Sequence, residues 1–170
     1  MGYVTERMKP EDWRQVRSIY LEGIATGDST FEADTPDWEK WDSAHLQEHR
    51  LVVRDGEDIL AWAALSPVSD RCVYSGVAEL SLYVASEHRG RGIGSVLIEA
   101  IIDSTEEAGI WTLQGGIFPE NKASIRLARK HRFKEVGKRE KIGKMTYGNH
   151  AGTWRDVILV ERRSTVTGIE

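Results

Sequence analysis

The sequence predicts one mixed α/β domain, and three observations support this fold class. A chain of 170 residues can build one well-packed domain but is short for two of ordinary size. Strand patterns outnumber helix patterns early in the chain and alternate with them later. No internal repeat, low-complexity tract or linker divides the chain. We therefore predict a single domain over residues 1–170, with 163–170 as a loose tail.

Four segments carry helix patterns. Pro10-Glu11-Asp12 opens the first, in which apolar residues recur at helical spacing from Trp13 to Ile24. The third follows a glycine-rich turn, and the fourth begins at Asn121, a residue type suited to cap a helix. The predicted helices span residues 10–24, 36–49, 92–108 and 121–130.

Seven segments carry strand patterns. Two of them flank Asp55-Gly56-Glu57-Asp58, which is typical of a hairpin turn with glycine at a position of positive φ. The predicted strands span residues 3–8, 50–54, 59–65, 77–84, 111–118, 133–142 and 153–162.

Composition narrows the function classes. A net charge of -4 and a pI near 5.8 argue against a nucleic-acid partner. Apolar runs are too short to span a bilayer, and the first residues lack the apolar core of a signal peptide, so we expect a cytoplasmic protein without membrane contact. The single cysteine, Cys72, excludes an internal disulfide, and the histidines have no metal-binding spacing, so no metal is predicted.

One stretch departs from the acidic average. Two readings are open for its charge: a solvated strand face, which is the commoner outcome, or a positive rim that attracts a phosphorylated cofactor or an anionic substrate. Its basic residues are Arg129, Lys130, Arg132, Lys134, Lys138, Arg139, Lys141 and Lys144.

The strand at 77–84 leads through a glycine-rich turn into a helix. Backbone N–H groups of such a turn and of the helix N-terminus converge on a site that suits a pyrophosphate. Glycine at 90, 92 and 94 lets phosphate oxygens approach the main chain, and Arg89 and Arg91 add positive charge. A dinucleotide fingerprint fails because Ser95 replaces its third glycine, and no Walker A sequence is present.

The pattern Arg89-x-x-Gly92-x-Gly94 resembles the coenzyme A loop of GNAT acetyltransferases. The similarity extends to the phosphinothricin N-acetyltransferase-like branch through further segments in the same order. These are Thr30-Phe31-Glu32, Leu65-Ser66-Pro67, residues 71–74, Glu79-x-Ser81-x-Tyr83-Val84, residues 111–114, Phe118-Pro119-Glu120-Asn121-x-x-Ser124-Ile125 and Trp154-Arg155-Asp156-Val157.

This resemblance implies a central mixed sheet of about six to seven strands flanked by about four helices, with acetyl-CoA as cosubstrate. A main-chain N–H near Leu82 would stabilise the tetrahedral intermediate. Asn121 would bind the pantetheine arm besides capping its helix, and Ser124 would reach the cofactor. The arm would be lined by Leu82, Tyr83 and Val84, and the pyrophosphate would be held by Arg89, Gly90, Arg91, Gly92, Ile93, Gly94 and Ser95.

Glu79 is the candidate catalytic residue. Strand alternation places it with Ser81 and Tyr83 on one face, opposite an apolar set that belongs to the core. Burial in this strand would raise the pKa of its carboxyl towards that of a useful base, and related enzymes use a glutamate here to take the amine proton. The alternative is a structural ion pair, for example with Arg71.

Substrate-binding candidates are Phe31, Arg71, Tyr74 and Trp154, although the three aromatic residues are more often plain packing. Arg71 is the candidate partner for a substrate carboxylate, because Ser75 stands where the branch often has arginine. Two more departures matter. Ala128 replaces the tyrosine or histidine of related enzymes and cannot donate a proton, and Arg132 replaces a glycine expected to end the helix in the left-handed conformation.

The leading hypothesis is an N-acetyltransferase acting on the primary amine of a small molecule. Candidate acceptors are phosphinothricin, methionine sulfoximine, arsinothricin or another amino acid, and the enzyme is expected to be a homodimer. Two alternatives stay open: a protein N-terminal acetyltransferase, and an acetyl-CoA-binding sensor without turnover, which the missing donor at Ala128 favours slightly.

Overall fold

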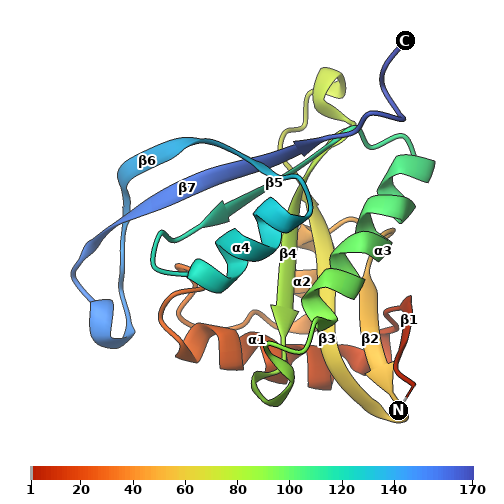
Figure 1. Cartoon of the computed structure of the whole chain (residues 1–170). Coiled ribbons are helices and arrows are strands. Elements are labelled where there is room, and N and C mark those ends of the chain that lie inside the picture. Colours follow the sequence, from red (N-terminus) through yellow and green to blue (C-terminus); the bar gives the residue numbers. More distant parts are fainter. Residues whose placement is uncertain (1) are drawn as a thin grey trace.

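The computed structural model describes residues 2–170. Its seven-stranded sheet has the order β1-β2-β3-β4-β5-β7-β6, in which β4 and β5 are parallel and all other neighbours antiparallel. The mixed sheet confirms the predicted fold class (Figure 1). The strands are β1 (Val4–Arg7), β2 (Leu51–Asp55), β3 (Asp58–Pro67), β4 (Val77–Val84), β5 (Thr112–Ile117), β6 (Lys134–Lys144) and β7 (Trp154–Arg163).

Helices cover both faces of the sheet. The central strand β3 is buried on both sides, so Ala61, Ala63 and Leu65 pack into one apolar cluster while Trp62 and Ala64 pack into the other. The first cluster lies under α3 (Ile93–Glu107) and α4 (Lys122–Lys130). The second lies under α1 (Trp13–Ala25) and α2 (Trp38–Ala44).

Three predicted elements differ from the structure in informative ways. The helix α2 ends at Ala44 rather than near residue 49, because Arg50 donates to the carbonyls of Asp42, His45 and Leu46 and closes the helix end. Short 3-10 turns precede α1 and α3. Arg132 itself adopts the left-handed conformation (φ 65°) that was expected to require glycine.

The C-terminal residues fold back on the domain. Ser164 is buried and its N–H donates to the carbonyl of Trp111 (2.8 Å), while the guanidinium of Arg163 donates to the carbonyls of Thr167 and Gly168. The β6–β7 hairpin projects from the other end of the sheet (Figure 1). No helix within residues 2–170 has the length and apolar character needed to cross a membrane.

Candidate active site

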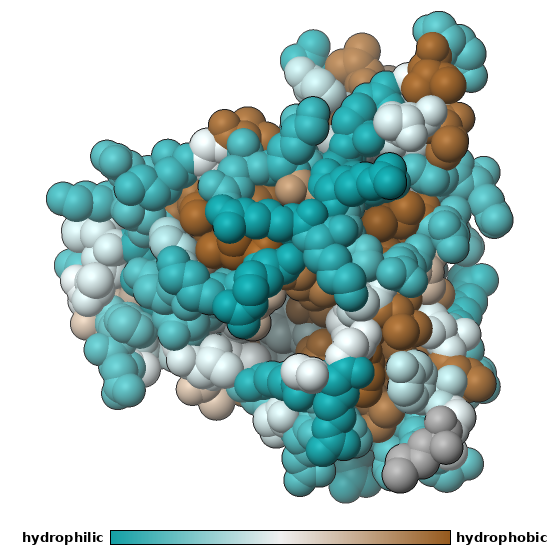
Figure 2. Space-filling model, viewed as in Figure 1, coloured by the Kyte–Doolittle hydropathy of each residue, from teal (hydrophilic) through white to brown (hydrophobic). Residues whose placement is uncertain are grey.

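The strands β4 and β5 separate soon after they begin. They pair only at three positions, Val77–Glu79 with Thr112–Gln114, and β4 then continues to Val84 without β5 beside it. This divergence leaves backbone polar groups of residues 80–84 without a partner strand on that side. A cavity of about 1270 Å³ opens in the gap. Figure 2 shows this face hollowed near its centre, with hydrophobic surface inside the hollow.

The glycine loop lies between β4 and α3. Gly90 (φ 74°) and Gly92 (φ 81°) adopt the left-handed conformation, and Gly92 is the N-cap of α3. A Cβ atom at either position would meet no protein atom within 4 Å, so the loop presents open backbone to the cavity. The first N–H groups of α3 have no intrahelical partner, and the positive end of the helix dipole adds to their attraction for an anion.

Basic side chains lie near this turn. Arg89 lines the cavity and its Nε donates to the carbonyl of Val84 (3.1 Å). Lys130 and Arg126 reach the same region from α4. Arg91 is the one residue of the predicted loop set, 89–95, that does not line the cavity.

Ser95 connects α3 to α4. It is buried, and its Oγ lies 2.7 Å from Nε2 of His131 and accepts a hydrogen bond from Nζ of Lys130 (2.8 Å). Burial lowers the pKa of His131, with smaller opposing and reinforcing effects of nearby charges. The hydroxyl of Ser95 is therefore engaged by α4, and its backbone N–H remains for an anion at the helix end.

The predicted pantetheine residues lie together. Leu82, Tyr83 and Val84 all line the cavity, as do Asn121 and Ser124. The Asn121 Oδ1 accepts the backbone N–H of Ser124 (3.2 Å), so Asn121 caps α4 as expected while its amide NH₂ has no recorded partner within residues 2–170.

Glu79 lines the cavity where β4 and β5 begin to separate. Nε2 of Gln114, its register partner on β5, donates to Oε2 of Glu79 (3.2 Å). The expected burial is wrong, because the separation of the strands exposes this side chain. The alternative ion pair with Arg71 is also absent among the described residues, since Arg71 lies over the ring of Tyr74 (5.5 Å to its centroid).

The predicted substrate residues are divided by the structure. Phe31 lines the cavity, and its ring packs edge-on against Phe118 (4.9 Å between centroids) and directly on the backbone of Gly143. A Cβ atom at position 143 would lie 2.7 Å from this ring, so only glycine fits there. Arg71, Tyr74 and Trp154 are exposed and do not line the cavity.

Sequence reasoning assigned no role to Arg155, which is only 3% exposed. Its guanidinium donates to the carbonyl of Gly27 (2.9 Å) and to the carboxylates of Asp28 (2.8 Å) and Glu120 (3.3 Å). The same group lies 4.0 Å from the centroid of the Phe118 ring. Arg155 thus fixes the loop after α1 to the turn before α4. The sequence signal for such a role is an arginine on the inward-facing side of a predicted strand.

The structure also places Ala128 and the basic run that the sequence analysis noted. Ala128 is buried and lines the cavity, so its position supplies no proton donor. The basic run that follows lies mostly on the exposed strand β6, as expected of a solvated face, but Arg139 lines the cavity. Residues 2–170 contain no group of three or more histidine, cysteine, aspartate or glutamate side chains able to hold a metal ion.

This geometry can be compared with known proteins. The profile of the acetyltransferase (GNAT) family matches residues 10–133. YwnH of Bacillus subtilis, which is named a putative phosphinothricin acetyltransferase, is 34% identical over 131 residues, which cover 74% of this chain and 80% of the relative. The phosphinothricin N-acetyltransferase of Streptomyces coelicolor is 29% identical over 160 residues, covering 89% and 91% of the two chains.

Solved structures agree on the fold. The phosphinothricin acetyltransferase of Sinorhizobium meliloti in complex with acetyl-CoA superposes with a TM-score of 0.86 at 22% identity, over 100% of this chain and 92% of that one. Taken together, the profile, the relatives and the separated strands with their glycine loop show that this chain is an enzyme of the acetyltransferase (GNAT) family, in its phosphinothricin N-acetyltransferase-like branch.

Proposed function

We propose that the enzyme transfers the acetyl group of acetyl-CoA to the primary amine of a small molecule, an amino acid or a close analogue. The observation that carries this proposal is one continuous cavity, which reaches from the anion-binding turn at Gly92 along the open edge of β4 to the carboxylate of Glu79. The glycine loop at one end could hold the pyrophosphate of the acetyl donor, and the carboxylate at the other end could act as the base for the acceptor amine.

The cofactor would occupy the half of the cavity formed by the glycine loop and α4, which we call the cofactor half. Its pyrophosphate would accept hydrogen bonds from backbone N–H groups of the loop and of the first turn of α3, and the positive charge of Arg89 would add to the attraction. Its pantetheine arm would bind the unpaired backbone of residues 80–84 in place of a strand, with the amide of Asn121 as a further donor. That the acetyltransferase of Sinorhizobium meliloti forms a complex with acetyl-CoA supports acetyl-CoA as the ligand of this half.

The reaction needs a neutral amine beside the thioester. Glu79 would take the proton of the incoming ammonium, directly or through water, and the amine nitrogen would then attack the acetyl carbonyl carbon. The backbone N–H near Leu82 would donate to the developing oxyanion. When the new C–N bond has formed, the nitrogen loses a second proton, the C–S bond breaks, and the thiolate of coenzyme A leaves and takes up one proton, so that the products are the amide, the free thiol and the proton first taken by Glu79. The Gln114 amide holds one oxygen of Glu79 and leaves the other free for the amine.

The acceptor would enter the remaining half, which we call the acceptor half. It is lined by residues 28–32, the end of β5, and parts of β6 and β7. Phe31, Phe118 and the backbone of Gly143 pack together in its wall and give a small molecule an apolar surface to bind against. The names of the two curated relatives point to phosphinothricin, and methionine sulfoximine, which the name of a third relative gives, carries the same ammonium and carboxylate groups.

The test is release of free coenzyme A thiol from acetyl-CoA across a panel of amino acids, simple amines and short peptides. We expect turnover with amino-acid analogues. Glu79→Gln should keep the affinity for acetyl-CoA and lower turnover by roughly 10²–10⁴-fold, the usual worth of general acid–base catalysis. Glu57→Gln, on the exposed β2–β3 turn, is the matched control for loss of one carboxylate.

Three results would contradict the proposal. Turnover with peptides alone would indicate an N-terminal acetyltransferase. Tight binding of acetyl-CoA without turnover on any acceptor would indicate a sensor. A Glu79→Gln variant that keeps both the rate and the acidic limb of the pH–rate profile would show that Glu79 is structural.

A further inference from the structure

Arg139 differs from the other basic residues of β6. Its neighbour Lys138 points to solvent, where it pairs with Glu140 and Asp156 (3.7 Å each). Arg139 lies on the cavity side, opposite Val157 of β7, and makes no ion pair or side-chain hydrogen bond within residues 2–170. A guanidinium has five N–H donors in a fixed plane, so this side chain presents open donors to the cavity.

A backbone irregularity sets this position. The pairing of β6 with β7 shifts register between Glu135 and Gly137, runs regularly from Gly137 to Arg139, and resumes only at Gly143. Between them Lys141 has a positive φ of 47°, and its N–H donates to Oδ1 of Asp156 (2.8 Å) instead of to the neighbouring strand. Such a bulge bends the strand and redirects its side chains. It returns Ile142 and Gly143 to the cavity, next to Phe31.

The charges of the cavity are unevenly distributed. Its other cationic lining residues, His88, Arg89, Lys122, Arg126 and Lys130, all belong to the cofactor half. In the acceptor half Asp28 and Glu120 are both paired with Arg155. Arg139 is therefore the cation that the acceptor half offers to a ligand, among the residues described here.

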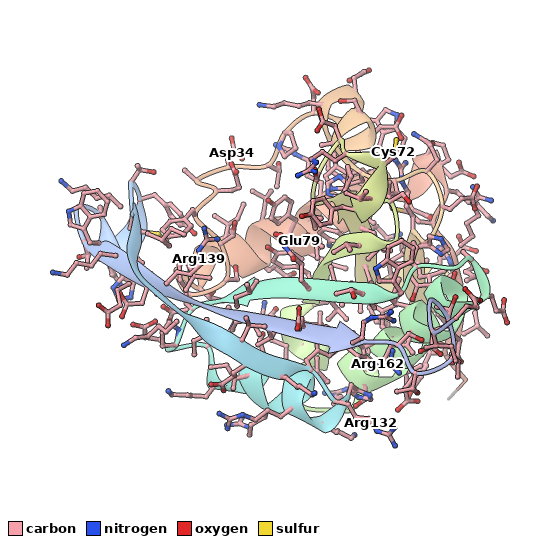
Figure 3. All side chains as sticks on the ribbon, turned by 90° about the horizontal axis from the view of Figure 1, so that it is seen from above. Asp34, Cys72, Glu79, Arg132, Arg139 and Arg162 are labelled. Atoms are coloured by element: carbon pink, nitrogen blue, oxygen red, sulfur yellow. The ribbon has the colours of Figure 1, made fainter. Side chains whose placement is uncertain are left out.

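Figure 3 shows how Arg139 stands relative to the proposed base. Glu79, from β4, lies near the centre of the view and Arg139, from β6, lies beside it on the side of the β6–β7 hairpin, and both residues line the same cavity. A molecule with an ammonium and a carboxylate would be bound in one orientation between them, with its amine at Glu79 and its carboxylate at Arg139.

We propose that Arg139 recognises a carboxylate of the acceptor and so makes the enzyme select amino acids over simple amines; this rests on the proposed function. The planar guanidinium can bind a carboxylate through two parallel hydrogen bonds. Arg71, which the sequence favoured for this role, lies over Tyr74 on an exposed segment outside the cavity. The structure therefore favours Arg139 for this contact.

The test compares two acceptors, L-methionine sulfoximine and its decarboxylated amine, with wild type, Arg139→Met and Arg139→Lys. Lys138→Met, on the same strand but outside the cavity, is the matched control. Arg139→Met should raise KM for the amino acid by about 10- to 100-fold, the usual worth of a hydrogen bond to a charged group, and change KM for the amine by less than about two-fold. Arg139→Lys should restore part of the difference, and Lys138→Met should change neither acceptor.

The inference is overturned if Arg139→Met changes both acceptors equally, or if Lys138→Met reproduces its effect. It is also overturned if Arg71→Ala gives the selective loss and Arg139→Met does not. In each of these cases wild type still turns over, so the proposed function stands. A wild-type enzyme that acetylates neither acceptor nor any other small amine would instead refute the proposed function, and this inference with it.

Discussion

Alanine substitutions at two glycines of the same backbone conformation can distinguish the effect of backbone strain from an effect on cofactor binding. Gly92 (φ 81°) lies in the loop before α3, and Gly56 (φ 58°) lies in the β2–β3 hairpin outside the cavity. A Cβ atom at either position would meet no protein atom within 4 Å. Alanine at each site should therefore strain the backbone alike, but only at Gly92 should the methyl group occupy space that the cofactor needs.

The expected loss of stability is small at both sites. An L-residue in the left-handed region costs roughly 1–2 kcal/mol, and the reduced entropy of the unfolded chain offsets about 0.4–1 kcal/mol of this. We expect Gly92→Ala and Gly56→Ala each to lose about 1 kcal/mol, which lowers Tm by about 2–4 °C in a domain of this size. Thermal unfolding without ligand measures this quantity.

The affinity for acetyl-CoA should differ between the two variants. A methyl group at Gly92 should disturb at least one N–H contact to a phosphate, a charged hydrogen bond worth about 1.5–3 kcal/mol, or roughly 10- to 150-fold in Kd. Gly56→Ala should bind as wild type does. Calorimetric titration provides the assay. Equal affinities in two folded variants would refute the assignment of this loop to the cofactor.

Two further predictions concern the end of α4. Arg132→Gly should stabilise the protein by about 1 kcal/mol, because it removes a left-handed arginine (φ 65°) whose side chain has no recorded partner within residues 2–170; an unchanged or lower midpoint in denaturant would contradict this. Burial lowers the pKa of His131 below 6.5 in the folded state. Between the two pKa values the unfolded state therefore binds a proton at this histidine and the folded state does not, so the free energy of unfolding falls as the pH drops below about 6.5 towards the pKa of the folded state. His131→Gln should flatten this fall relative to wild type in unfolding measured from pH 7 to pH 5, and an unchanged slope would exclude His131 as its source.

The cofactor half could be predicted from the sequence because its signals are local. The alternation of residues 77–84 gives the faces of β4, the glycine spacing gives the loop, and Asn121 gives the start of α4. Each of these features depends on residues within one turn or one strand. They lie within two neighbouring stretches of the chain and needed no knowledge of long-range packing.

Long-range contacts decided what the sequence could not show. The exposure of Glu79 follows from the separation of β4 from β5. These two strands are more than thirty residues apart in the sequence, since Glu79 pairs with Gln114. The end of α2 is fixed by Arg50, which reaches back from the start of β2. Neither effect is visible in the periodicity of the segment concerned.

The acceptor half is the extreme case of this dependence. Its walls come from the loop after α1, the end of β5 and the β6–β7 hairpin, and the guanidinium of Arg155 joins the loop after α1 to the turn before α4. The direction of Arg139 depends on a bulge that spans the two strands of the hairpin. If the proposed function holds, substitutions in the hairpin should change the acceptor without disturbing the loop that is proposed to hold the cofactor. Because the two halves are built from different segments, an enzyme of this fold can keep one acetyl donor while its acceptor changes.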